Sequence, residues 1–186
     1  CPIGDRNWTD ESRELFIRLL ASGPALLNVW EDIDFIDVPG KLIPEWLGVR
    51  NRPSASAAHR YTIDRHMVEV VTRLGRETPS GGRYDDRHYE ALLLAGILHD
   101  IGKRPGVANH AAEGARHATV VVERMGFDRD IVRWVTLLVR EHLTLSEFAT
   151  GRNPNDPNVG DDLAGRLDHN PVLLDMLFDL TRADGS

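Results

Sequence analysis

The stretch Ala91-Leu-Leu-Leu-Ala-Gly-Ile-Leu-His-Asp-Ile-Gly-Lys103 joins an apolar run of helical length to two adjacent side chains of metal-binding type. His99 and Asp100 follow the hydrophobic run at the end that points into a core. A charge that is buried there without a partner costs several kcal/mol. The sequence therefore predicts a compensating group close to both side chains.

Helical periodicity continues on both sides of this stretch, and no alternation of the strand type competes with it. Asp85 or Asp86, Asp128 and Asn170 are typical N-cap residues. A break at Pro39-Gly40 and a long polar loop over 151–158 are also expected. The fold should be all-α. The expected helices cover residues 10–21, 24–34, 62–76, a central helix of about 17 residues ending at His99-Asp100, 111–125, 128–142 and 170–184.

The chain divides by composition into an N-terminal helical arm with a linker, residues 1–58, and a main body, residues 59–186. The boundary is the stretch 51–58, which is rich in Ser, Ala, Asn and Pro. With 186 residues, the chain is long enough for one substantial core. Because it begins with Cys1 and ends abruptly, we expect a fragment of a longer, multidomain protein.

Composition excludes several classes of partner. The formal net charge is −7 and no cluster of Lys and Arg occurs, so a nucleic-acid surface is not expected. Cys1 is the single cysteine, which rules out an internal disulfide. Neither a signal peptide nor a membrane-spanning apolar stretch is present in the sequence, which predicts a cytoplasmic protein without a membrane partner.

Metal-ligand side chains recur on the apolar sides of four expected helices. A single histidine on such a face is more often a hydrogen-bonded structural residue. The prediction of a metal site therefore rests on several potential ligands that lie on the buried sides of different helices. Asp184 would lie in the last turn of its helix, where the macrodipole opposes a carboxylate unless a cation offsets it. The four helices carry His66, His99 with Asp100, His142, and Asp184.

Imidazoles and carboxylates without thiolates suit a divalent ion such as Mn, Fe, Co, Zn or Mg, with coordination positions left open for water. Such an ion assists the hydrolysis of phosphate esters. The sequence offers no rival chemistry: it has no Gly-x-Ser-x-Gly elbow, no phosphate-binding glycine loop and no His-Glu-x-x-His helix. We therefore expect a metal-dependent phosphohydrolase.

The ordered set of His66, His99-Asp100 and a distant Asp184 resembles the HD superfamily of metal-dependent phosphohydrolases. The resemblance implies an HD-domain helical bundle behind the short N-terminal arm. It extends from about residue 12 to the end, and within the superfamily the chain resembles the HD domain of the bifunctional PII uridylyltransferases and uridylyl-removing enzymes. Four segments carry this narrower likeness: His59 to His66, Leu98 to Lys103, Val139 to Leu143, and Leu180 to Asp184.

The resemblance implies roles for individual residues. Asp100 would bridge two ions and be essential for catalysis. Two further roles follow from position and not from the resemblance. Lys103, three residues after Asp100, would contribute to catalysis by contacting a substrate phosphate, or it is a solvated charge at a helix end. Arg152 in the long polar loop is a second candidate for binding substrate. Because Gly102 stands where the family usually has Ala, the pattern leaves the position of His110 open. The implied metal ligands are His66, His99, Asp100 and Asp184, with His110 and His142 added where a second ion binds.

The implied reaction is the hydrolysis of the phosphodiester that joins UMP, or in actinobacterial relatives AMP, to a tyrosine of the nitrogen signal protein PII. Modified PII would be the partner, and a nucleotidyltransferase domain and glutamine-sensing domains would lie elsewhere in the parent chain. Two alternatives remain: an HD-type hydrolase of a free nucleotide such as guanosine tetraphosphate, and a catalytically silent helical scaffold. The intact set of ligands disfavours the scaffold.

Overall fold

A computed structural model describes residues 8–53, 61–78, 81–151 and 157–185. Within these ranges the chain is all-α, as predicted, and contains no strand. The elements are α1 (Asp10–Leu20), α2 (Ala25–Phe35), α3 (Val38–Leu42), the 3₁₀ turn η2 (Pro44–Gly48), α4 (Ile63–Glu77), α5 (Asp86–Leu98), α6 (His110–Arg124), α7 (Arg129–Glu141), α8 (Thr144–Gly151), α9 (Pro157–Arg166) and α10 (Pro171–Asp184).

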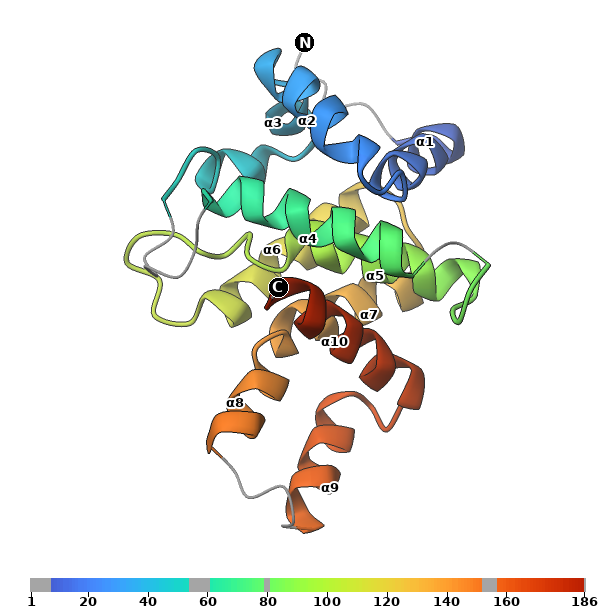
Figure 1. Ribbon diagram of the computed structural model, residues 1–186, viewed down its shortest axis with the longest axis vertical. Helices are drawn as coiled ribbons and strands as arrows, with labels where there is room; N and C mark the ends of the chain where they lie inside the picture. The colour runs from blue at the N-terminus through green and yellow to red at the C-terminus, as the bar shows by residue number, and fades with distance from the viewer. Residues whose placement is uncertain (1–7, 54–60, 79–80, 152–156, 186) are drawn as a thin grey trace.

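Helix α5 is the centre of the molecule. The seven hydrophobic residues Ala91 to Ala95, Ile97 and Leu98 are completely buried, and α4, α7, α1, α10 and α6 all pack on the helix. Figure 1 shows α1 to α3 together at one end of the body, whereas α8 and α9 project from the opposite end. The apolar run identified in the sequence is therefore buried on every side.

Side-chain caps begin the helices that carry the site. Asp85 accepts a hydrogen bond from the backbone N–H of His88, and Asn170 accepts one from Val172. Asp128 accepts from two backbone N–H groups of α7. These bonds satisfy N–H groups that a helix leaves unpaired at its start, which confirms the predicted caps.

Three local predictions need correction. The central helix ends at Leu98 after 13 residues, with His99 as its C-cap, so it is shorter than expected. Pro39-Gly40 does not break the chain but lies inside α3, because a proline near the start of a helix occupies a position whose N–H is free in any case. A polar loop is expected over 151–158, but residue 151 belongs to α8 and residues 157–158 belong to α9; residues 152–156 lie outside the described ranges.

An ion pair joins the arm to the body. Both carboxylate oxygens of Glu45 in η2 accept hydrogen bonds from Arg124 of α6, at 2.6 and 2.9 Å. Burial alone would raise the pKa of Glu45, but the pairing with Arg124 lowers it below its ordinary value of 4.5. The pair therefore stabilises the fold at neutral pH and is lost as pH falls through this lowered pKa.

We expect Glu45→Gln to reduce the free energy of unfolding by about 1 kcal/mol at pH 7, because a charge-assisted pair becomes a neutral contact. Below pH 4 the difference in free energy of unfolding between the variant and the wild-type protein should shrink, because Glu45 of the wild-type protein takes up a proton. Urea unfolding across this pH range measures the effect. Glu123→Gln, an exposed change in the same helix as Arg124, is the control. A loss that is equal at pH 7 and pH 3 would contradict the assignment.

Candidate metal centre

Metal-ligand side chains from five helices meet at one place beside α5. His66 lies in the first half of α4, His99 and Asp100 directly follow α5, and His110 is the first residue of α6. His142 is the C-cap of α7, and Asp184 is the last residue of α10. The described chain thus brings together residues that are up to 118 positions apart in sequence.

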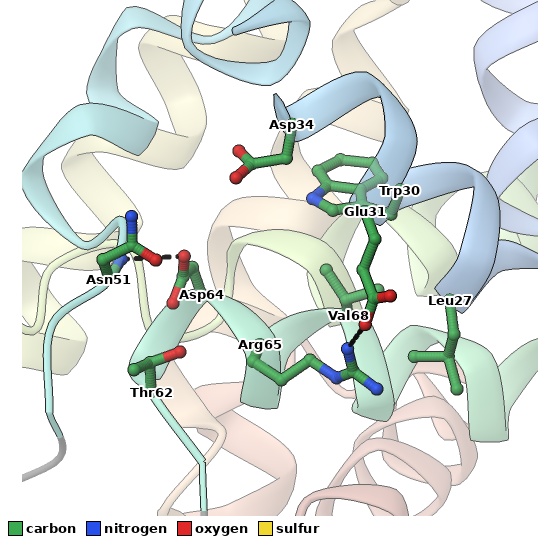
Figure 2. Close-up of a pocket in the computed structure, with 9 residues that line it drawn as sticks. All are labelled: Leu27, Trp30, Glu31, Asp34, Asn51, Thr62, Asp64, Arg65 and Val68. Atoms are coloured by element: carbon green, nitrogen blue, oxygen red, sulfur yellow. Dashed lines mark hydrogen bonds and ion pairs between the residues drawn. The ribbon is translucent and has the colours of Figure 1, made fainter. Parts of the chain in front are cut away.

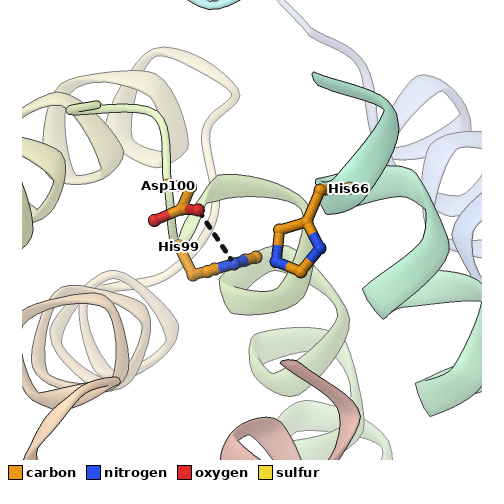
Figure 3. A group of neighbouring side chains, drawn as sticks. All are labelled: His66, His99 and Asp100. Carbon is orange, nitrogen blue, oxygen red and sulfur yellow. Dashed lines mark ion pairs between the residues drawn. The ribbon is translucent and has the colours of Figure 1, made fainter. Parts of the chain in front are cut away.

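One group of ligand atoms surrounds His99. His66, His99 and Asp100 each place one potential ligand atom within 4.8 Å of the others (Figure 3). Asp184 completes this group, because its Oδ1 lies 2.6 Å from Nε2 of His66 and 3.5 Å from Nε2 of His99. The geometry could hold a metal ion.

A second group lies on the other side of Asp100. Nε2 of His142 is 3.5 Å from Oδ1 of Asp100, and Nε2 of His110 is 3.7 Å from the same oxygen. The other carboxylate oxygen, Oδ2, faces His99 at 3.6 Å. Each oxygen of Asp100 therefore faces one of the two groups, which is the arrangement that a bridging ligand requires.

Backbone carbonyls fix the orientation of two imidazoles. Nδ1 of His99 lies 2.9 Å from the carbonyl oxygen of Gly96, and Nδ1 of His142 lies 2.7 Å from that of Val139. Because a carbonyl only accepts hydrogen bonds, Nδ1 must be the donor in both rings. In the neutral imidazole this leaves an electron pair on Nε2, aimed at the site, as in the supported histidines of metal proteins.

Several buried nitrogen and oxygen atoms of the candidate ligands have no hydrogen-bond partner. Leaving one such atom unpaired costs about 1–3 kcal/mol, and a whole fold is stable by only about 5–15 kcal/mol. Distances of 3.5–3.7 Å to Asp100 are too long for hydrogen bonds. They suit ligands that share an ion, because two bonds of about 2.1 Å at tetrahedral angles separate the atoms by about 3.5 Å. The unpaired atoms are Nε2 of His99, His110 and His142 and Oδ1 of Asp100.

The electrostatics of the site also favour a cation. Burial alone would raise the pKa of Asp100, but interactions with His99, His142 and Lys103 hold it well below its usual range. Burial would lower the pKa of His99, yet Asp100 and Asp184 raise it to about 9. The two carboxylates thus remain charged inside the protein and draw positive charge toward Nε2 of His99.

The remaining predicted residues have different surroundings. Nζ of Lys103 donates a hydrogen bond to Oδ2 of Asp100 at 2.8 Å, so this partly exposed lysine contacts the site. Arg152 lies outside the described residues. The catalytic and substrate-binding roles of Lys103 and the substrate-binding role of Arg152 stay predictions.

One buried carboxylate beside the site, Glu141, was not predicted from the sequence. Glu141 precedes His142 and accepts hydrogen bonds from Thr144 at 2.6 Å and from Arg166 of α9 at 3.2 Å. These bonds hold α8 and α9 against the end of α7. Its position next to a predicted ligand was the available signal, but Arg166 is too distant in sequence to be foreseen as its partner.

A pocket between α2 and α4 is separate from this centre. Its volume is about 180 Å³, and none of the candidate ligands lines it. Figure 2 shows Glu31 paired with Arg65, and Asp64 accepting a hydrogen bond from the backbone N–H of Asn51 at 2.8 Å. These contacts connect the arm to α4.

Known proteins resemble almost the whole chain. It is 38% identical over 178 residues to the bifunctional uridylyltransferase/uridylyl-removing enzyme of Streptomyces coelicolor. The aligned residues cover 95% of this chain and 20% of the relative. The enzyme of the same name from Mycobacterium tuberculosis is 34% identical over 177 residues, 95% of this chain and 21% of the relative. The chain is homologous to one segment of these bifunctional enzymes.

A relative of the same name from Caulobacter vibrioides is 35% identical over 181 residues, with 91% of this chain and 19% of the relative covered. The chain thus spans about a fifth of the length of the bifunctional enzymes that it matches. No protein-family model matches it. The resemblance to the bifunctional enzymes that the motifs predicted is confirmed, and the relatives are enzymes by name.

In the described part of the chain, none of the helices combines the length and the apolar character needed to cross a membrane.

Proposed function

We propose that this chain is a metal-dependent HD phosphodiesterase domain that removes UMP, or AMP, from a modified tyrosine of PII. The observation that carries the proposal is Asp100, whose two carboxylate oxygens face separate groups of buried ligands. The relatives are named for uridylyl removal, which supports this choice of substrate. The other domains of such enzymes would lie in the parent chain.

The ligands divide between two ions. His66, His99 and Asp184 would hold one ion together with Oδ2 of Asp100. His110 and His142 would hold the other together with Oδ1 of Asp100. Bound divalent ions lower the pKa of water and stabilise the negative charge that develops on a phosphoryl oxygen. The donor set of four imidazoles and two carboxylates fits Mn, Fe, Co, Zn or Mg.

The site is closed on one side and open on the other. His99 and His142 are almost fully buried, whereas the side chains of Lys103, His110 and Asp184 are 27%, 26% and 22% exposed. A structural metal site has no reason to keep an open edge, but a catalytic one must admit water and substrate. We therefore place the phosphodiester at the edge formed by these three residues.

The chain's own residues then orient the reaction. Lys103 would bind a nonbridging phosphoryl oxygen while its ammonium stays next to Asp100. Water would add to phosphorus and lose a proton. The bond from phosphorus to the tyrosyl oxygen would break, and the tyrosine would leave with the electron pair and take up a proton from solvent. Because a phenol has a pKa of about 10, its oxygen leaves readily and the site needs no strong general acid. The products are the nucleoside monophosphate and unmodified tyrosine.

The decisive experiment incubates the chain and Mn²⁺ with uridylylated PII, with adenylylated PII and with guanosine tetraphosphate, and follows nucleotide release. We expect release from one of the two PII substrates and none from the free nucleotide. Asp100→Asn, which keeps the shape of the side chain, is the matched inactive control. Hydrolysis of guanosine tetraphosphate alone would favour the free-nucleotide alternative, and no hydrolysis at all would favour the scaffold.

Lys103→Met should keep metal binding and reduce the rate of nucleotide release by about 10²–10³-fold, because it removes a charge aimed at the transition state while keeping most of the aliphatic stem. Release rates at saturating Mn²⁺, together with the metal content of the purified protein, measure this. Lys41→Met in the arm is the control. An unchanged rate would show that Lys103 merely neutralises Asp100.

A further inference from the structure

We propose that Gly102 sets the position of His110 and thereby decides whether the centre holds a second metal ion. The inference rests on the proposed two-ion centre and deepens it. It answers the question that the sequence left open, namely whether an unusual glycine after the His-Asp pair is compatible with a ligand at His110.

The contact at Gly102 leaves no space for a side chain. A Cβ atom at this position would lie 2.3 Å from the carbonyl oxygen of His110 and 2.3 Å from the backbone nitrogen of Gly114. Both are backbone atoms of α6, so no side-chain rotation can relieve the overlap. Gly102 does not have a positive φ, and alanine is therefore excluded by this contact alone.

A second glycine faces the first. A Cβ at Gly114 would meet the nitrogen of Gly102 and the carbonyl oxygen of His99, both at 3.4 Å, and Cγ1 of Val139 at 3.3 Å. The start of α6 therefore packs between the turn that follows α5 and the side of α7. His110 begins α6, so the approach of the two glycines determines how close its imidazole comes to Asp100.

The start of α6 should move when this contact is filled. The turn after α5 is rigid because His99, Asp100 and Ile101 are buried, and backbone hydrogen bonds join Ile101 to Leu98 and Lys103 to Asp100. The start of α6 is less constrained, because the connection that leads to it is exposed at residues 105, 106, 108 and 109. Within its first turn Ala112 is exposed, whereas Ala111 is buried. A methyl group at position 102 would therefore displace His110 and leave the ligands of the first group in place.

The size of the movement decides the outcome. The 2.3 Å contact must open to at least 3.0 Å, a movement of 0.7 Å. Metal-ligand bonds tolerate deviations of about 0.2 Å. Displacement of His110 thus exceeds the tolerance for the second ion. The three atoms nearest to the new methyl group all belong to His110 and Gly114 of α6, and none belongs to His66, His99 or Asp184.

The test is a calorimetric titration of the metal-free chain with Mn²⁺, followed by electron paramagnetic resonance of the loaded protein. We expect two ions and a spin-coupled signal for the wild-type chain. Gly102→Ala should keep the first ion, weaken the second by about 10–100-fold and lose the coupling. His110→Ala should give the same result, and the double variant should be no worse than His110→Ala.

Two controls separate this effect from a general effect of added methyl groups. Gly114→Ala fills the same contact from the other side, but its nearest neighbours are 3.3–3.4 Å away, so we expect a much smaller loss of the second ion. Gly165→Ala adds a methyl group where nothing lies within 4 Å and should bind two ions as the wild-type chain does.

Several outcomes would overturn the inference. Gly102→Ala that binds two ions with unchanged affinity would show that the contact does not control His110. Loss of both ions together with the helical circular dichroism signal would make Gly102 a general folding requirement instead. A wild-type chain with one ion would end both this inference and the two-ion centre. Two ions without nucleotide release would end the proposed function alone.

Discussion

Asp100→Ala is expected to abolish the binding of both metal ions and to reduce nucleotide release by at least about 10⁴-fold. The carboxylate faces both ligand groups, so its removal takes one ligand from each ion at once. The substitution also leaves His99 without one of the two carboxylates that raise its pKa. No other single side chain in the described site faces both ligand groups.

Metal content, determined after dialysis against Mn²⁺, and the rate of release from modified PII measure the effect. Asp179 provides a matched control, because it is an equally buried aspartate of α10 that accepts a hydrogen bond from Tyr84 at 2.6 Å. Asp179→Asn should weaken the fold and keep both ions. An Asp100→Ala protein that binds two ions and releases nucleotide would falsify the bridging role.

Trp46→Ala is expected to lower the free energy of unfolding by about 3–5 kcal/mol, the usual cost of truncating a large buried aromatic side chain. Trp46 is completely buried in η2, and its ring centroid lies 5.3 Å from that of Trp30 in α2. Both rings belong to the same hydrophobic cluster as the residues of α4 and α5. The arm and the body should therefore unfold in one transition.

Urea unfolding followed by circular dichroism and by tryptophan fluorescence measures this change. Leu47, the next residue, has a side chain that is largely exposed, so Leu47→Ala should change stability by less than about 0.5 kcal/mol. Two separate transitions, with Trp46→Ala affecting just the first, would show instead that the arm is an independent unit.

Helices with strong capping residues and a regular apolar stripe could be predicted from the sequence. α7 has both, with Asp128 at its start and Ile131, Val135 and Leu138 on its buried side. α8 and α9 could not be predicted, because they are short and have no stripe of buried apolar residues. They are stabilised by contacts such as that of Arg166 with Glu141. Tertiary contacts of this kind leave no local signal.

Like the helices, the candidate metal centre could be predicted from the sequence only in part. His66, His99 and Asp184 lie on the apolar sides or at the ends of periodic helices, so their convergence could be foreseen. The position of His110 could not, because it depends on the backbone of Gly102 approaching that of Gly114. A glycine in a sequence shows that a side chain is absent, but it does not show which atoms occupy the space.

The helix termini that meet at the centre influence the order in which metal and substrate bind. α5, α7 and α10 all end at the centre, whereas α6 begins there. The C-terminal ends of α5, α7 and α10 carry partial negative charge from the helix dipole, which adds to the charges of Asp100 and Asp184, whereas the start of α6 contributes a partial positive charge. An anionic phosphodiester would be repelled by this field until cations have entered. We therefore expect an ordered mechanism, in which metal binds first and substrate follows.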